Sequence, residues 1–318
     1  MPDPAPRVLP FGSQAVAEAA RLIAQGEPVA VPTETVYGLA ADATRANAVA
    51  RIYAAKGRPS FNPLIVHVLD LTAAEAIAEF DSDALALAHA FWPGPLTLVL
   101  PLRAGATVAS LVTAGLPTVA IRVPAHQAMR ALLGAAGVPL AAPSANRSGG
   151  ISPTRAEHVT TSLGAAVPLI LDDGSTQAGL ESTIVHGRAI LRPGPITAEE
   201  IAQAFHPGEG RGPVTVSSES TPDRPTSPGQ LLSHYAPKKP LRLDATTAAP
   251  DEWRIGFGPV TGDDNLSTSG DPVEAAANLF DALHRADASP KPRIAVAPIP
   301  SEGVGEAISD RLRRAARR

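Results

Sequence analysis

Short apolar runs alternate with amphipathic or alanine-rich segments over the first two hundred residues, a pattern typical of an α/β domain. Residues 13–25 predict the first helix, because apolar side chains recur every three or four positions from Val16 to Ile23 and Gly26 can end it. Eight further apolar runs predict strands, enough for one large twisted sheet. They are residues 28–31, 64–68, 96–100, 118–123, 138–142, 168–171, 183–185 and 189–191.

Helix starts are marked as well. Three T-x-x-E boxes place a threonine where its hydroxyl can cap a helix, and a glutamate where its carboxylate can accept the N–H of the cap residue. We therefore expect helices to begin at Thr72 with Glu75, at Thr154 with Glu157, and at Thr197 with Glu200.

The texture changes over residues 207–240, which are rich in Pro, Gly, Ser and Thr and show no apolar period. We interpret this stretch as a linker between a catalytic domain, residues 1–206, and a small second domain, residues 241–318. Its segment GQLLSHYAP, residues 229–237, carries an aromatic ring, an imidazole and two leucines, so we expect it to dock on the protein.

The second domain is also expected to be α/β. Two strand-like runs, RIGFGPV and RIAVAPI, are each flanked by helical stretches at residues 272–284 and 305–316. The closing RLRRAARR is interpreted as a solvated last turn whose arginines complement the helix dipole, with an RNA-binding tail as the alternative.

Composition limits what the chain can be. Its 318 residues, 44% of them hydrophobic, suffice for about two domains, and the formal charge of -4 argues against a protein that wraps nucleic acid. There is no cysteine, which excludes disulfides and thiolate sites. No apolar run reaches the ~18 residues of a membrane span and the N-terminus lacks a hydrophobic signal core, so we expect a cytoplasmic protein.

The stretch KGRPSFNPL, residues 56–64, holds the first candidate chemistry. Pro59 and Pro63 disfavour helix, so a fixed loop is expected. Lys56 and Arg58, two positions apart on extended backbone, would then point the same way. Such a pair predicts a cationic clamp for an anion.

A second candidate, PTETVYGLAADA at residues 32–43, follows a buried strand directly. Sites in open α/β sheets lie where strands end, so Thr33, Glu34, Thr35 and Tyr37 are placed for binding. The alternative is a β-turn whose pair of hydroxyl groups is satisfied internally.

The run TVAIRV is more informative, because strand alternation sends Val119, Ile121 and Val123 to one face of the sheet and Arg122 to the other. An arginine buried within a central strand needs a carboxylate or phosphate, and its planar fork suits a carboxylate. We favour a ligand as that partner. The alternative is an ion pair with a neighbour in the sheet.

Two more strand ends carry polar residues. PLAAPSANRSGGISPT, residues 139–154, runs into a loop whose backbone N–H groups, with a helix behind them, form a candidate phosphate cradle. LDDGSTQAGLESTIVHG adds Asp172 and Asp173, which either touch Mg²⁺ or form a turn, and the hydroxyl groups of Ser182 and Thr183.

Several familiar motifs are absent from the sequence. There is no P-loop, no histidine spacing of a zinc site and no G-x-S-x-G elbow. His67 lies on the face of its strand opposite Leu64, Val66 and Val68, where a structural histidine and a ligand are equally compatible with the pattern.

These stretches belong to a longer series that resembles the Sua5/YrdC/YciO family. The series runs in order over residues 32–237: PTETVYGLAADA, KGRPSFNPL, WPGPLTLVL, VAIRVP, APSANRSGG, ESTIV, ILRPG and SPGQLLSHYAP. The last of these, with the second domain, resembles the long Sua5-type branch. The resemblance implies an α/β fold with a YrdC-like twisted mixed sheet and helices, and a smaller Rossmann-like C-terminal domain.

The activity implied by the resemblance is that of a nucleotidyltransferase. It would join L-threonine, bicarbonate and ATP into L-threonylcarbamoyladenylate, with release of pyrophosphate and water, for the t6A modification of tRNA at position 37. Mg²⁺ would accompany the ATP, and no metal ligand is assigned to the protein. The product would be handed to the t6A transferase complex, and neither stable tRNA binding nor membrane contact is expected.

The family's KxR and SxN signature falls on Lys56, Arg58, Ser144 and Asn146, so the clamp would be for ATP phosphates and Lys56 and Arg58 would be the catalytic pair. Further implied ATP-binding residues are Asn62, Thr118, Ser152, Arg192 and Tyr235. The implied L-threonine-binding residues are Thr35, His67, Arg122, Ala142 and Ser182, with Ala142 acting through its backbone where relatives often carry a hydroxyl residue. The segment with Tyr235 is the candidate lid.

Two rival functions fit the sequence less well. A non-catalytic RNA-binding protein would need a basic surface with aromatic side chains, and this chain is acidic with 4% aromatic residues. An enzyme of the same fold that acts on carbamoyl phosphate is disfavoured by the Sua5-type linker.

Overall fold

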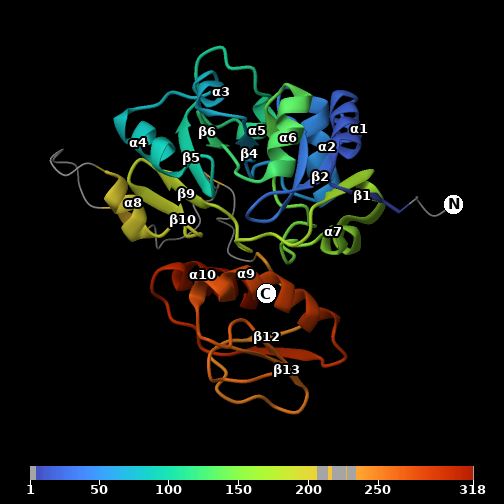
Figure 1. Cartoon of the computed structure of the whole chain (residues 1–318), viewed down its shortest axis with the longest axis vertical. Coiled ribbons are helices and arrows are strands. Elements are labelled where there is room, and N and C mark those ends of the chain that lie inside the picture. Colours follow the sequence, from blue (N-terminus) through green and yellow to red (C-terminus); the bar gives the residue numbers. More distant parts are fainter. Residues whose placement is uncertain (1–4, 206–213, 217–226, 228–233, 318) are drawn as a thin grey trace.

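The computed structural model describes residues 5–205, 214–216, 227 and 234–317. Most of the predicted linker, including residues 229–233 of the GQLLSHYAP segment, lies outside them. The described chain forms a larger α/β domain with a smaller one beneath it (Figure 1).

One mixed sheet of eleven strands organises the first domain, with the order β1-β8-β2-β3-β7-β4-β6-β5-β9-β10-β11. All eight predicted strands are confirmed, whereas β1, β3 and β11 were not predicted. The strands are Arg7–Pro10 (β1), Val29–Pro32 (β2), Tyr37–Asp42 (β3), Ile65–His67 (β4), Leu96–Pro101 (β5), Thr118–Arg122 (β6), Leu140–Ala141 (β7), Leu169–Asp172 (β8), Thr183–His186 (β9), Ala189–Arg192 (β10) and Thr215–Val216 (β11).

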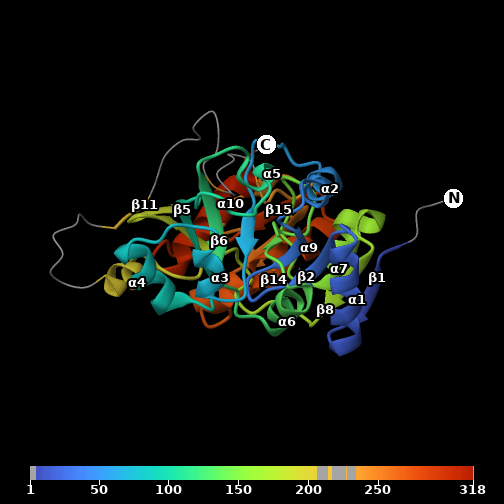
Figure 2. The same ribbon diagram turned by 90° about the horizontal axis from the view of Figure 1, so that it is seen from above.

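The helices of the first domain cover the two faces of this sheet unequally (Figure 2). Helices α2, α4, α7 and α8 contribute to the core on one face, whereas α1 and α6 pack on the other face over β1, β2, β3, β7 and β8. The helices are Ser13–Ala24 (α1), Ala46–Lys56 (α2), Leu71–Glu75 (α3), Ser82–Phe91 (α4), Ser110–Thr113 (α5), Gln127–Ala136 (α6), Ala156–Leu163 (α7) and Ala198–Ala204 (α8), with a short 3-10 turn at Gly164–Ala166.

Helices α1 and α6 leave half of one face of the sheet uncovered. Alternation along the central strands decides which side chains lie on this free half. Val119 and Ile121 of β6 join the large core, as the sequence predicts, and Ala120 lies on the opposite face with Ile65 and Ile184. This free half of the sheet is where His67 and Arg122 follow on β4 and β6.

The second domain is a small parallel sheet with two helices on it. Its strands are Leu241–Arg242 (β12), Glu252–Gly256 (β13), Asp264–Asn265 (β14) and Arg293–Val296 (β15), in the order β12-β15-β13-β14. Helices Pro272–Ala288 (α9) and Val304–Ala316 (α10) lie between this sheet and the first domain (Figure 1).

The two domains share one apolar core. Val36, Ile151 and Leu180 of the first domain, and Tyr235 after the linker, belong to the buried cluster formed by α9, α10 and the second sheet. The domains are therefore packed together by side chains rather than held only by the chain between them. Among the described residues, no helix combines the length and the apolar composition needed to cross a bilayer.

Of the three predicted capping boxes, one is confirmed. Thr197 accepts the N–H of Glu200, and the Glu200 carboxylate accepts the N–H of Thr197. The other two threonines do not cap a helix, although a helix begins within two residues of each: Thr72 lies inside α3, which is capped by Asp70, and α7 begins two residues after Thr154.

The confirmed box gives a direct test. We expect Thr197→Ala to lower the free energy of unfolding by about 1 kcal/mol, because the helix loses a side-chain cap. The control is Thr72→Ala, which changes the same residue type at an exposed position that caps nothing. Urea unfolding followed by far-UV circular dichroism measures both, and equal effects of the two substitutions would contradict the assignment.

Candidate active site

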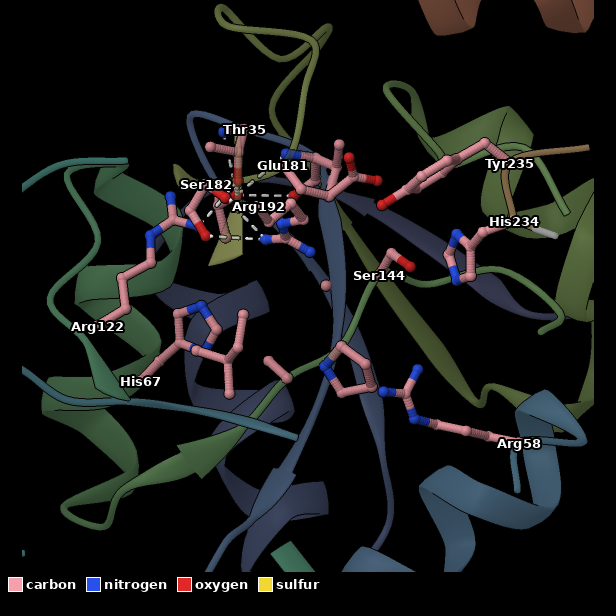
Figure 3. A pocket seen from close by; sticks show the side chains of 16 residues that line it. Thr35, Arg58, His67, Arg122, Ser144, Glu181, Ser182, Arg192, His234 and Tyr235 are labelled. Atoms are coloured by element: carbon pink, nitrogen blue, oxygen red, sulfur yellow. Dashed lines mark hydrogen bonds between the residues drawn. The ribbon is translucent and has the colours of Figure 1, made fainter. Parts of the chain in front are cut away.

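A cavity opens on the half of the sheet that α1 and α6 leave free (Figure 3). Its empty space, open mouth included, amounts to about 550 Å³. The lining residues are Thr33, Thr35, Val36, Gly38, Arg58, Ile65, His67, Arg122, Ala142, Pro143, Ser144, Glu181, Ser182, Arg192, His234 and Tyr235.

Arg122, the last residue of β6, is held by the loop that follows β2. Its guanidinium donates to Glu34 Oε1 at 2.6 Å, to Thr35 Oγ1 at 3.0 Å and to the Gly94 carbonyl at 3.1 Å. The ion pair that the sequence offered as the alternative therefore exists, although Glu34 belongs to a loop rather than to a neighbouring strand. Because arginine has five N–H donors, the guanidinium keeps donors for a ligand.

Thr33 and Thr35, beside Glu34, form an internally bonded turn and also line the cavity, so both interpretations of this stretch hold. Thr33 Oγ1 lies 2.7 Å from Thr35 Oγ1 and also donates to the Val36 carbonyl, so the pair of hydroxyl groups is satisfied as in a turn. Both residues nevertheless line the cavity. Tyr37 does not, because its hydroxyl donates to Gly174 and Asp172 on the other side of the sheet.

The acidic turn at Asp172 and Asp173 is structural. Asp172 Oδ1 accepts the N–H of Gly174 at 3.0 Å, and Asp173 Oδ2 accepts a hydrogen bond from Gln127 at 2.7 Å. Neither aspartate lines the cavity. Among the described residues, no group of three or more His, Asp and Glu side chains is placed to hold a metal ion.

His67 lies beside Arg122 in the register of β4 with β6. Burial, and next the charge of Arg122, lower the pKa of His67 to about 3. The imidazole is therefore neutral at pH 7, and its Nδ1 has no hydrogen-bond partner among the described residues. A neutral ring facing the cavity can accept or donate one hydrogen bond to a ligand.

Lys56 and Arg58 do not form the predicted pair on extended backbone. Lys56 is the last residue of α2, and Gly57, with a φ of 59°, ends that helix and turns the chain. Lys56 Nζ donates to the carbonyls of Ser144 and Asn146 at 2.6 and 2.5 Å, whereas Arg58 donates to Asn62 Oδ1 at 2.7 Å and lines the cavity. The prediction of two parallel prongs is wrong, because a helix end separates them.

The loop after β7 bonds only part of its backbone N–H groups internally. The N–H groups of Ala145, Arg147, Ser148 and Gly150 already donate to Tyr37, Ser162, Lys56 and Arg147, respectively, whereas those of Ser144, Asn146 and Gly149 have no hydrogen-bond partner among the described residues. The phosphate cradle therefore stays a prediction, and the side chain of Ser144 faces the cavity (Figure 3). Lys56 therefore fixes the carbonyls of this loop, and burial lowers the pKa of Lys56 well below its usual value.

Arg192 and Ser182 lie between these groups (Figure 3). Arg192 donates to the Ser182 carbonyl at 2.9 Å and to Ser182 Oγ at 3.1 Å, and that hydroxyl lies 2.7 Å from Thr97 Oγ1. Arg122 and His67 lie on one side of the cavity, and Arg58, His234 and Tyr235 lie on the other. The arrangement offers two cationic ends with hydroxyl groups between them.

Tyr235 closes the second end. The residue is fully buried at a positive φ of 64°, its ring packs on Phe280 of α9, and its hydroxyl has no hydrogen-bond partner among the described residues. The neighbouring Ala236 donates to the Gly149 carbonyl at 2.8 Å. The expectation that the GQLLSHYAP segment docks is confirmed for its described part.

Comparison with known proteins decides the family. A model of the Sua5, YciO and YrdC proteins, described as "Telomere recombination", matches residues 21–194. A model described as "Threonylcarbamoyl-AMP synthase, C-terminal domain" matches residues 196–317. The chain belongs to the Sua5/YrdC/YciO family.

Two relatives show how far the likeness extends in this family. A threonylcarbamoyl-AMP synthase of Bacillus subtilis is 41% identical over 95% of this chain and 92% of its own length. Another of Pyrococcus abyssi is 39% identical over 93% of this chain and 92% of its own. A crystal structure of P. abyssi Sua5 complexed with L-threonine has a TM-score of 0.87 at 35% identity, covering 97% and 96% of the two chains.

The ATP- and threonine-binding residues implied by the Sua5-family resemblance fall into three groups by their position relative to the cavity. Nine line the cavity: Thr35, Arg58, His67, Arg122, Ala142, Ser144, Ser182, Arg192 and Tyr235. Four lie just behind it and bond to its residues or loops: Lys56, Asn62, Asn146 and Ser152. Thr118 is not brought to the cavity, because it lies at the other end of β6 from Arg122, opposite Pro101.

Polar atoms without partners gather at the same place. Asn62 Nδ2, His67 Nδ1, Asn146 Oδ1 and the Tyr235 hydroxyl are buried and have no hydrogen-bond partner among the described residues. Since buried polar groups are rarely left unpaired, their presence around one cavity indicates a site for a polar ligand.

Sequence reasoning assigned no role to Glu181, His234 or Arg311. Glu181 stands in the quoted stretch ESTIV, just before the predicted strand at residues 183–185, and a carboxylate buried there would need a partner, the argument that was used for Arg122. Arg311 contradicts the predicted solvated last turn, because its side chain is fully buried and donates to Glu181 at 2.9 Å.

The neutral state of His67 predicts a pH dependence. Between pH 6.5 and about 3, an unfolded His67 binds a proton and the folded one does not, so stability is lost as the pH falls through this window. At pH 5, His67→Gln should remove about 2 kcal/mol of the wild-type loss relative to pH 7. Urea unfolding at the two pH values measures this, with His89→Gln as an exposed control. An unchanged pH dependence in His67→Gln would contradict the assignment.

Proposed function

We propose that the cavity is the site at which this Sua5-family protein joins L-threonine, bicarbonate and ATP into L-threonylcarbamoyladenylate. Relatives that match over nine-tenths of the chain are named threonylcarbamoyl-AMP synthase, so the chain is a nucleotidyltransferase of the route to t6A in tRNA. The observation that carries the assignment to this cavity is that three arginines, Arg58, Arg122 and Arg192, line it together with hydroxyl groups.

The end with Arg122 suits the amino acid. The free donors of Arg122 can take the threonine carboxylate, and Glu34 fixes the direction of the fork. His67, Thr35 and Ser182 surround this end with groups that can bond the hydroxyl and the amine. The L-threonine complex of the P. abyssi relative supports an amino acid as the occupant.

The end with Arg58 suits the polyphosphate. Arg58 and Arg192 line it without an ion-pair partner among the described residues, so their charge is available to an anion. Ser144 offers a hydroxyl there, and Lys56 holds the loop that carries it. The cavity wall offers Mg²⁺ no aspartate, and its one glutamate, Glu181, is already bonded by Arg311.

We infer that Mg²⁺ would enter with the nucleotide and would be held by its phosphates, with the hydroxyl groups of Ser144 and Ser182 on the cavity wall as the protein oxygens that would complete its ligands. When bound, the ion neutralises charge on the phosphates. The side chains of the protein supply the remaining positive charge.

The chemistry requires positioning more than a strong protein nucleophile. The neutral amine of threonine attacks the carbon of bicarbonate, water leaves, and a carbamate oxygen then displaces pyrophosphate from the α-phosphorus. Negative charge collects on the pyrophosphate as it departs, where Arg58 and Arg192 would stabilise it. Arg122 would hold the amino acid in line with that phosphorus.

The carbamate of threonine is labile in water, so the site needs cover. Tyr235 and His234 form one wall of the cavity, and Tyr235 joins the core of the second domain. We propose that this segment is the lid, and that the adenylate is released to a cytoplasmic t6A transferase complex once it opens.

The decisive experiment detects the product. Mass spectrometry after mixing the protein with ATP, Mg²⁺, threonine and bicarbonate should show threonylcarbamoyl-adenylate, and omission of any reactant should abolish it. Arg58→Ala should lower turnover about 100-fold or more, as expected for loss of a charge that stabilises the departing anion. The exposed Arg21→Ala serves as the control, and normal turnover in Arg58→Ala would remove that residue from the mechanism.

The two ends of the cavity can be tested separately. Arg122→Lys replaces a planar fork by a single ammonium group, so the KM for threonine should rise roughly 10- to 100-fold. The KM for ATP should rise about threefold or less, because the polyphosphate end is intact. Steady-state pyrophosphate release measures both constants. Equal losses for the two substrates would show that Arg122 does not belong to the threonine end.

A further inference from the structure

Helix α10 of the second domain brings one arginine to the rear wall of the cavity. The Arg311 side chain is completely buried, and all three of its nitrogens are bonded: Nε to Glu181 Oε2 at 2.9 Å, Nη1 to Asp310 at 2.8 Å and Nη2 to the Pro193 carbonyl at 3.0 Å. Glu181 and Pro193 belong to the first domain. Arg311 therefore connects the two domains, and each nitrogen of its guanidinium group has a hydrogen-bond acceptor.

Its partner Glu181 is the one acidic side chain among the described residues that line the cavity. Its other carboxylate oxygen accepts a hydrogen bond from Ser152, and Ser182 follows it in the chain. Burial raises the pKa of Glu181, but the charges of Arg311 and Arg192 outweigh it and hold the pKa below its usual value. The group is thus a carboxylate, and without Arg311 it would repel a polyphosphate.

Arg311 also supports Tyr235. Its guanidinium carbon lies 5.1 Å from the centre of the Tyr235 ring, within cation–π range, and Phe280 of α9 packs against the same ring at 5.6 Å. One side chain of the second domain therefore contacts both a wall residue and the lid residue of the cavity.

The surrounding interface is closely packed. A Cβ added to Gly179 would lie 2.4 Å from the Ala277 carbonyl oxygen of α9, so the two backbones approach as closely as glycine allows. His158 and His284 stack across the interface with ring centres 3.8 Å apart. Contacts of this kind leave Arg311 little freedom relative to Glu181.

We propose that Arg311 is a positioning residue of the active site, through which the second domain completes the polyphosphate end of the cavity. It neutralises and orients Glu181 and supports Tyr235, and it touches no reactant itself. This inference rests on the proposed function for its substrates, but the contacts that carry it do not depend on that function.

The test compares Arg311→Met with Arg155→Met in the full-length protein. Arg155 is the matched control, because it forms an ion pair with Asp281 across the same interface but is 46% exposed and does not line the cavity. Arg311→Met should raise the KM for ATP at least tenfold and the KM for threonine less than threefold. Arg155→Met should change neither by more than twofold. Equal effects of the two substitutions would overturn the proposal.

A double variant separates positioning from a general loss of structure. If Arg311→Met loses activity because the Glu181 carboxylate is left without a partner, adding Glu181→Gln should raise kcat/KM for ATP at least fivefold above that of Arg311→Met. A double variant no better than Arg311→Met at equal thermal stability would contradict the proposal. Arg311→Lys keeps the charge but loses the fork, so it should remain folded and raise the KM for ATP at least threefold; an unchanged KM would also count against it.

The outcome remains interpretable if the proposed reaction is wrong. Absence of threonylcarbamoyl-adenylate with the wild-type protein would overturn the function. Calorimetric titration with ATP alone would then compare wild type with Arg311→Met. Weaker binding by tenfold or more would support the positioning role, and equal binding would overturn it.

Discussion

Burial of positive charge around one cavity is the constraint on which the rest of this structure depends. Five cationic side chains are each at most 8% exposed: Lys56, Arg58, Arg122, Arg192 and Arg311. Removing such charges from water is costly unless oxygen atoms replace the lost hydration. Two of them, Arg122 and Arg311, have carboxylate partners, and among the described residues the other three bond only to neutral oxygens. That uncompensated charge is the physical reason for an anionic ligand.

The topology of the sheet makes room for this charge. Helices α1 and α6 cover one half of a face, so β4 and β6 end in the open, with His67 and Arg122 at adjacent positions. A half-covered sheet would normally expose its apolar residues, here Ile65 and Ile184 among others. Ile65 lines the cavity together with Tyr235, which belongs to the apolar cluster of the second domain, so this half of the sheet carries a polar cavity rather than a second helical layer.

The sequence predicts what local patterns encode. Alternation in TVAIRV assigned the faces of β6 correctly, because a buried face imposes a period of two. It could not show that Lys56 ends a helix, since the two prolines after it argued for a loop, nor that β3 follows the turn at Glu34. Arg311 was missed because its partner Glu181 lies 130 positions away, and nothing local distinguishes it from the exposed arginines of a last helical turn.

Opening of the cavity should occur at Tyr235 rather than between the domains. The interface is held by the directional bonds of Arg311 to Glu181 and Pro193, and separating the domains would break these bonds together with the apolar packing of the shared cluster. Tyr235 is held mainly by ring packing, and its hydroxyl makes no hydrogen bond within the described residues. Because such contacts are weaker and less directional, the proposed lid would move at Tyr235 while Arg311 and Glu181 keep their positions.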